Sequence, residues 1–144
     1  MNAKNGLITE QDLASYSAKW REPVCGDYRQ YTVCGMAPPS SGGIAVLQIL
    51  GQLEPFAVNK MSANSAEAVH LFTQSSRLAF ADRDKYVADS DFVEVPTQAL
   101  IAKAYMASRS ALINTNQDMG NAQAGIPSKD TVAYADNDGF EAFD

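Results

Sequence analysis

The sequence has few of the residues that bind metal ions or nucleic acids. Its 144 residues include two cysteines and one histidine, and these do not supply the four ligands of a zinc site. Eleven Lys and Arg stand against 17 Asp and Glu, which gives a formal net charge of −6. Because nucleic acids and anionic membranes are bound by clustered positive charge, we expect neither as a partner, and no metal.

Long apolar runs are also missing. No stretch reaches the roughly 20 consecutive apolar residues that cross a bilayer. Met1 to Lys4 lead into polar sequence, without the pattern of a signal peptide. Hydrophobic residues still make up 46% of the chain and charged residues 19%, which is enough for a buried core. The length suits one domain or a substantial piece of one.

One stretch organises the chain. It lies between a strand-like segment that ends near Val33 and an apolar run that starts at Ile44, and it consists of Pro38, Pro39, Ser40, Ser41, Gly42 and Gly43. The prolines hold the backbone extended, the serines offer hydroxyls to the free N–H groups of a helix start, and the glycines let another backbone approach closely. The stretch predicts the entry into a buried helix. An anion site at that helix start is the less favoured alternative.

Three motifs in order point to a known family. Besides the proline–serine–glycine stretch, they are Gly6-Leu7-Ile8-Thr9-x-x-Asp12-Leu13-Ala14-x-Tyr16 upstream and Ala81-Asp82-Arg83 downstream. From about Gly6 to about Tyr105 the chain resembles the C-terminal part of the large subunit of the gamma-glutamyltranspeptidase family. The resemblance implies an α+β fragment of an N-terminal-nucleophile (αββα) hydrolase fold, mostly helical with a β-hairpin. It also implies a secreted or periplasmic parent enzyme without a cofactor, so we expect this chain to be an internal piece of it.

We expect the sequence to divide into leading residues 1–5, a domain over 6–113, and a flexible linker and pre-cleavage tail over 114–144. The domain is expected to contain a short helix opened by Thr9 with Asp12, a hairpin over 21–36, and helices over about 42–52, 64–87 and 97–112. Asn64 or Ser65 is the expected cap of the 64–87 helix. Helical spacing selects the expected buried residues: Leu13 and Tyr16; Ile44, Leu47 and Leu50; Val69, Phe72, Ser76, Ala79 and Phe80; and Leu100, Ala104, Tyr105 and Leu112.

The two cysteines fall within the predicted hairpin. If Arg29 and Gln30 form a two-residue loop, Cys25 and Cys34 face each other across the strands, at a position where side chains lie close. A cross-strand disulfide is then geometrically possible, and a pair of free thiols is the alternative. The oxidising compartment that the resemblance implies favours the disulfide.

Charged residues near the centre of the chain are open to two interpretations. The resemblance gives Asp82 and Arg83 a structural role, as a polar link between a helix and a loop. Binding of a substrate carboxylate by Arg83 is less favoured, because the resemblance places that arginine outside this chain. His70 has no patterned nucleophile near it, so we expect a surface or boundary residue rather than a general base. The acids of 89–94 lack the glycine of a calcium loop.

The resemblance further implies a precursor that cuts itself, so that a threonine becomes the N-terminal nucleophile of a small subunit. The usual signature of that threonine, Thr-Thr-His-x-Ser, is absent here. We therefore expect no catalytic residue in this chain and a processing site at or near Asp144. A degenerate nucleophile at Thr131 is the alternative. The expected partners are that small subunit and a small gamma-glutamyl substrate such as glutathione. A cephalosporin acylase-type amidase and a noncatalytic helical binding module are the rival functions.

Overall fold

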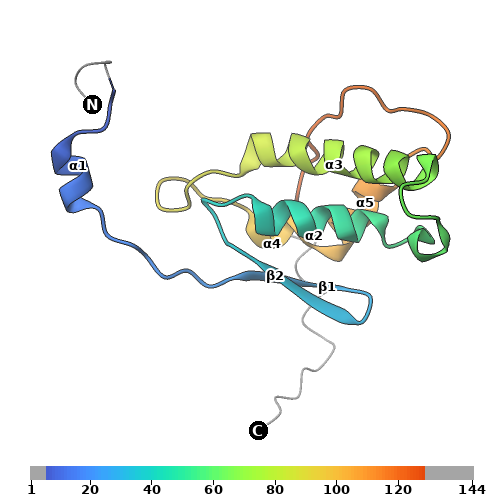
Figure 1. Cartoon of the computed structure of the whole chain (residues 1–144), viewed down its shortest axis with the longest axis horizontal. Coiled ribbons are helices and arrows are strands. Elements are labelled where there is room, and N and C mark those ends of the chain that lie inside the picture. Colours follow the sequence, from blue (N-terminus) through green and yellow to red (C-terminus); the bar gives the residue numbers. More distant parts are fainter. Residues whose placement is uncertain (1–5, 129–144) are drawn as a thin grey trace, which may run out of the picture.

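The computed structural model describes residues 6–128. Its elements are α1 (Glu10–Ser15), β1 (Val24–Tyr28), β2 (Tyr31–Gly35), α2 (Gly42–Leu53), the short 3-10 helix η2 (Val58–Lys60), α3 (Ala66–Tyr86), α4 (Thr97–Leu100) and α5 (Lys103–Ser110). Helix α2 is central, since it contacts α3, α5, α4 and both strands of the hairpin (Figure 1). The chain is thus mostly helical with one hairpin, as predicted. None of the helices in residues 6–128 combines the length and apolar character needed to cross a bilayer.

Two apolar clusters hold this arrangement together. The first cluster joins the hairpin to α2, α4 and α5. The second joins the end of α2 to α3 and to Ile113, which lies shortly after α5. Their buried members are Val24, Ile44, Leu47, Leu100 and Tyr105 in the first, and Leu53, Leu71, Leu78 and Ile113 in the second. Removal of this apolar surface from water is the main source of the fold's stability.

Helix α1 lies at the end of an extended arm, residues 16–23, away from the other helices (Figure 1). Its predicted start is confirmed: Thr9 Oγ1 accepts from the N–H of Asp12 at 3.1 Å, and the N–H of Thr9 donates to Asp12 Oδ2 at 2.8 Å. The expected burial of Leu13 and Tyr16 is wrong, since both side chains are exposed. The arm brings them to no core within the described residues.

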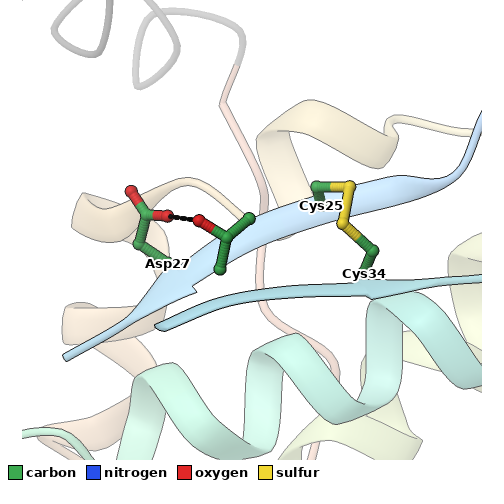
Figure 2. The surroundings of a disulfide bond; sticks show 4 residues. Cys25, Asp27 and Cys34 are labelled. Atoms are coloured by element: carbon green, nitrogen blue, oxygen red, sulfur yellow. Dashed lines mark hydrogen bonds between the residues drawn. A yellow bond between two sulfur atoms is a disulfide. The ribbon is translucent and has the colours of Figure 1, made fainter. Parts of the chain in front are cut away.

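The hairpin has the predicted two-residue loop, Arg29 and Gln30, and the predicted register, with Cys25 opposite Cys34. The structure places a disulfide between these cysteines, whose Cα atoms are 4.1 Å apart. Figure 2 shows it bridging the two strands, with a hydrogen bond from Thr32 Oγ1 to Asp27 Oδ1 on the same pair of strands. The alternate residues of β1 contact α2: Val24 is buried, and a Cβ added to Gly26 would lie 3.1 Å from Leu47.

The glycine pair at the start of α2 is explained by a close crossing of two backbones at Gly43. The end of β2 passes over the first turn of α2, and a Cβ added to Gly43 would lie 2.6 Å from the carbonyl oxygen of Met36. The predicted capping is only partly right: Ser41 is the N-cap residue but caps with no side-chain bond, whereas Ser40 Oγ accepts from the N–H of Gly42 at 3.4 Å. Ile44 and Leu47 are buried as predicted, and Leu50 is half-buried.

Helix α3 begins as predicted but buries a different face. Ser65 is its cap, with Ser65 Oγ accepting from the N–H of Ala68 at 3.2 Å. Of the predicted buried residues only Ala79 is buried; Ser76 is half-buried, and Val69, Phe72 and Phe80 are exposed. The residues that α3 buries are Leu71, Gln74, Ser75, Leu78, Ala79 and Asp82. Three of them are polar and hydrogen-bonded, which a pattern of hydrophobic residues does not detect.

The predicted helix over 97–112 is two short helices, α4 and α5, with Ala102 in an extended conformation between them. The break frees the carbonyl oxygen of Leu100, which accepts from Gln48 Nε2 at 3.0 Å. A contact with α2 therefore replaces a helical hydrogen bond. Leu100 and Tyr105 are buried as predicted, whereas Ala104 and Leu112 are exposed, because the break changes which sides of the chain face α2.

Residues 114–128, here called the strap, run along α3. His70 Nε2 lies 2.8 Å from the carbonyl oxygen of Asn114, and Arg77 contacts Asp118 and donates to the carbonyl oxygen of Gly120 at 3.0 Å. The sequence predicts a flexible linker here, and its flexibility stays a prediction. Thr131 and Asp144 lie outside the described residues.

Candidate functional site

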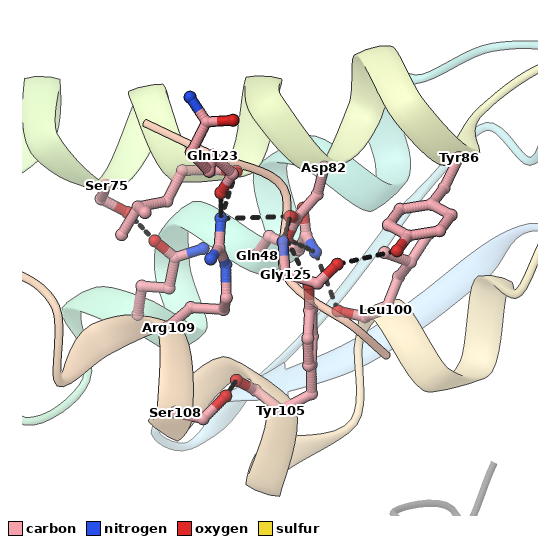
Figure 3. A network of polar contacts seen from close by, with 12 residues as sticks. Gln48, Ser75, Asp82, Tyr86, Leu100, Tyr105, Ser108, Arg109, Gln123 and Gly125 are labelled. Carbon is pink, nitrogen blue, oxygen red and sulfur yellow. Dashed lines mark hydrogen bonds and ion pairs between the residues drawn. The ribbon is translucent and has the colours of Figure 1, made fainter. Parts of the chain in front are cut away.

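A buried polar network lies where α2, α3, α5 and the strap meet, and Asp82 is at its centre (Figure 3). The carboxylate of Asp82 is fully buried. Its Oδ2 accepts from Gln48 Nε2 at 3.1 Å and from the hydroxyl of Tyr105 at 2.9 Å. Its Oδ1 accepts from the N–H of Gly125 at 2.8 Å and lies 3.1 Å from a guanidinium nitrogen of Arg109. One side chain thus connects four segments of the chain.

Arg109 supplies the positive charge of the network. Its side chain is almost as buried as that of Asp82, and it also donates to the carbonyl oxygens of Gln123 at 2.7 Å and Leu78 at 3.4 Å. Burial of an ion pair is offset only where hydrogen bonds satisfy both partners. Here the carboxylate is fully satisfied, while Arg109 Nε has no partner among the described residues.

Tyr105 and Tyr86 complete the attachment of the strap. Burial, followed by the hydrogen bond to Asp82, raises the pKa of Tyr105 well above its usual range, so its hydroxyl stays a donor. The Tyr86 hydroxyl donates to the carbonyl oxygen of Gly125 at 2.7 Å. Both backbone groups of Gly125 are therefore bound, and a Cβ added there would lie 2.5 Å from the Tyr105 hydroxyl oxygen. The network has the character of a structural anchor.

Sequence reasoning found Asp82 but missed its partners. Gln48 is a polar residue inside the apolar run 44–53, which is a detectable sign of a buried hydrogen bond. Arg109 and Tyr105 lie four apart on α5 and share one side of it. Gly125 carries no local signal, because its partner Asp82 is 43 residues away.

Arg83 lies beside the network but outside the core. Its Nε donates to Ser41 Oγ at 3.2 Å, and its guanidinium also pairs with Asp84 at 2.7 Å and lies 5.8 Å from the centre of the Phe80 ring. The hydrogen bond to Ser41 ties the end of α3 to the residue before α2, and the other two contacts lie within α3. The structure thus brings Arg83 to Ser41 of the organising stretch. The structural role that the sequence predicts for Arg83 stays a prediction.

A second charged cluster holds the arm to the loop that follows α3. Arg21 donates to Asp91 at 2.8 Å and Lys19 donates to the same carboxylate at 2.7 Å, while Arg21 lies 3.6 Å from Asp89. The hydrogen bond from Arg21, with that from Lys19, lowers the pKa of Asp91 to about 2. Asp89 and Asp91 are thus paired with cations of the arm. No group of three or more metal-binding side chains occurs within residues 6–128.

The fold is mostly helical with one β-hairpin, and a buried polar network centred on Asp82 joins α2, α3, α5 and the strap. A family model, described as Gamma-glutamyltranspeptidase, matches residues 1–140. The chain belongs to the gamma-glutamyltranspeptidase family.

Individual relatives agree with this assignment. The glutathione hydrolase proenzyme of Escherichia coli K12 is 48% identical over 117 residues, and the acylase ACY 1 proenzyme of Pseudomonas sp. SE83 is 44% identical over the same length; each match covers 81% of this chain. The crystal structure of Helicobacter pylori gamma-glutamyltranspeptidase superposes with a TM-score of 0.77 at 39% identity, covering 87% of this chain and 36% of that one. The chain spans about a fifth of the length of the curated relatives it matches.

Proposed function

We propose that the whole protein is a gamma-glutamyl transferase and hydrolase with an N-terminal-nucleophile fold, and that this chain supplies scaffold from its large subunit. The observation that carries the proposal is the family match over residues 1–140, together with relatives named as glutathione hydrolase proenzymes. The likeness to a solved gamma-glutamyltranspeptidase supports it. The described network supports the scaffold role, because its polar side chains are bound to one another and to the backbone.

The proposed reaction passes through an ester. The hydroxyl of an N-terminal threonine attacks the gamma-glutamyl carbonyl of glutathione or a similar amide, and the threonine's own amine takes the proton. The C–N bond breaks, the amine product leaves with that proton, and a threonine ester remains. Water or an amino acid then attacks the ester and regenerates the hydroxyl. The small subunit carries this threonine, so the isolated chain is expected to be inactive.

The position of the self-cleavage is also a proposal. We place the cut after Asp144, because Thr131 is followed by Val132, Ala133 and Tyr134 rather than by histidine and serine. Cleavage before Thr131 is the competing assignment. A secreted or periplasmic location is proposed as well, and the disulfide between Cys25 and Cys34 supports it, since structural disulfides persist in oxidising compartments.

An amidase of the acylase type is the second candidate for the whole protein. The 44% identity to an acylase proenzyme favours it, and that match covers the same share of the chain as the match to the glutathione hydrolase. Expression of the complete precursor, followed by parallel assays with a chromogenic gamma-glutamyl anilide and a cephalosporin side-chain amide, separates the two. We expect release of the anilide. If only the cephalosporin amide is hydrolysed, the acylase-type function replaces the gamma-glutamyl function as the proposal. Turnover of either substrate by this chain without the rest of the precursor would refute the scaffold role.

A further inference from the structure

The disulfide between Cys25 and Cys34 bridges the two strands of the hairpin (Figure 2). Its neighbours on β1 point toward α2, since Val24 is buried and a Cβ on Gly26 would meet Leu47. Because side chains alternate between the two faces of a strand, Cys25 points away from α2, and both cysteines are exposed. A dissolved thiol can therefore reach the disulfide without unfolding of the hairpin.

Cys34 also borders a hollow of about 960 Å³. The hollow lies between the arm, the residues that follow β2 and the loop after α3, and its lining includes Lys19, Trp20, Arg21, Met36 and Phe92. Apolar and charged side chains thus surround the space beside this cysteine. A short peptide carries groups of both kinds, so the hollow gives it room next to Cys34. Of the two sulfur atoms, that of Cys34 is the better target for an incoming peptide.

The hairpin is held in place by contacts other than the disulfide. Backbone pairing joins β1 to β2 on both sides of the cysteine pair. The end of β2 is also fixed at its crossing with α2, where a Cβ added to Gly35 would lie 2.6 Å from the Cα of Gly43. Opening of the disulfide therefore leaves Cys25 opposite Cys34, and an oxidising compartment closes the bond again. The cysteine pair has the geometry of a reversible site.

The proposed function supplies thiols to this site. Glutathione contains a cysteine, and removal of its gamma-glutamyl group leaves cysteinylglycine, which carries the same thiol. The relatives named as glutathione hydrolase proenzymes support such a substrate. Thiolates open disulfides by exchange through a mixed disulfide, and exposed disulfides are the labile ones. The substrate and the product of the proposed reaction are thus both reagents for the exposed disulfide.

We infer that Cys34 is a modification site, at which a cysteine-containing peptide thiol forms a mixed disulfide with the protein. The peptide thiolate attacks Cys34 Sγ, a new S–S bond forms, and the bond between Cys34 and Cys25 breaks. The sulfur of Cys25 leaves as a thiolate and takes a proton from water. Attack of the Cys25 thiolate on Cys34 Sγ reverses the step and releases the peptide thiol. The inference rests on the proposed function for the supply of the thiol.

Thiol exchange in the native, full-length gene product tests the inference. The protein is incubated with reduced glutathione, quenched with acid, alkylated with a maleimide and digested without reductant. Mass spectrometry is expected to find a peptide adduct on Cys34 and the maleimide on Cys25. S-methylglutathione, whose thiol is blocked, is the matched reagent control and should leave the disulfide closed.

Two variants make the adduct stable enough to count. Cys25→Ala lacks the thiol that reverses the step, so treatment with oxidised glutathione should load Cys34 and the adduct should persist. Cys34→Ala offers Cys25 alone, and it should react severalfold more slowly because the hollow borders Cys34. Equal rates for the two variants, or a wild-type adduct on Cys25 instead of Cys34, would overturn the assignment. A wild-type disulfide that opens only after denaturant is added would overturn the inference as a whole.

The mass of the adduct separates this inference from the proposed function. A protein that removes the gamma-glutamyl group converts glutathione to cysteinylglycine, so adducts of both thiols are expected on the wild type. An adduct of glutathione alone would count against the proposed function and would still support the modification site. Absence of either adduct, in a sample that does release cysteinylglycine, would count against the modification site alone.

Discussion

The backbone N–H of Gly125 donates to Asp82 Oδ1 at 2.8 Å, although the two residues lie 43 positions apart in the chain. The same oxygen forms an ion pair with Arg109, and the other carboxylate oxygen accepts hydrogen bonds from Gln48 and Tyr105. Asp82 therefore fixes the path of the strap as well as the packing of three helices. The charge of this one carboxylate is the feature on which the network depends.

Replacement of Asp82 by Asn is expected to destabilise the processed protein by about 3–5 kcal/mol, because it leaves the buried guanidinium of Arg109 without a counter-charge. Urea unfolding followed by circular dichroism measures the change. Asp84→Asn is the matched control, since Asp84 is exposed and pairs with its neighbour Arg83; loss of such a pair costs about 1 kcal/mol or less. Equal effects of the two substitutions would contradict the assigned role of Asp82.

The glycine pair at the start of α2 offers a second test, in which one glycine serves as the control for the other. A Cβ on Gly43 meets the Met36 carbonyl oxygen at 2.6 Å, whereas a Cβ on Gly42 has only Ser40 Oγ at 3.8 Å. Gly43→Ala is expected to lower the free energy of unfolding by about 1–3 kcal/mol, as in other overpacked cores. Gly42→Ala should change it little. If the two variants unfold at the same temperature, the close crossing of β2 and α2 does not require glycine at position 43, and this explanation is wrong.

The disulfide is expected to contribute about 2–3 kcal/mol, since the loop it closes is short, with a sequence separation of 9. The double variant Cys25→Ala/Cys34→Ala should therefore unfold at a lower urea concentration than the wild type. Dithiothreitol should shift the wild type toward the double variant and leave the variant unchanged. A variant as stable as the wild type, or a wild type insensitive to the reductant, would contradict this contribution.

The arm provides a prediction on pH. Hydrogen bonds from Arg21 and then Lys19 lower the pKa of Asp91 to about 2, below the ordinary value near 3.9. A carboxyl whose pKa is lower in the folded state stabilises it above the unfolded pKa, and loses this effect as the pH falls through the folded pKa. The stability difference between wild type and Asp91→Asn should be constant above about pH 4 and shrink toward pH 2. Because the cluster is exposed, added salt should reduce the difference. A difference that does not vary between pH 2 and pH 6 would contradict the assignment.

Local rules predicted the parts of the fold that depend on neighbouring residues. The register that pairs Cys25 with Cys34 follows from the length of the turn, and the caps at Thr9 and Ser65 follow from hydrogen bonds within one helical turn. The three motifs carried the family assignment. The buried face of α3 was predicted wrongly because Gln74, Ser75 and Asp82 are buried through polar partners, which hydrophobic spacing ranks as surface.

The Asp82 network could not be predicted from local sequence, because its partners come from distant parts of the chain. The break between α4 and α5 occurs where Gln48 donates a hydrogen bond to the carbonyl oxygen of Leu100, 52 residues away. No helix-breaking residue marks this position in the sequence. The same holds for Arg109 and Gly125, which meet Asp82 only after the three helices have packed. Such partners follow from tertiary packing, which overrides local propensity.

The central claim is that this chain is large-subunit scaffold, with the nucleophile on a separate subunit released by self-cleavage. Intact-mass analysis of the purified, full-length gene product, with N-terminal sequencing of its smaller piece, tests this most directly. The account predicts two chains, with the smaller one beginning at a threonine that follows Asp144. A smaller chain that begins at Thr131, or a single uncleaved chain that turns over a gamma-glutamyl anilide, would contradict it.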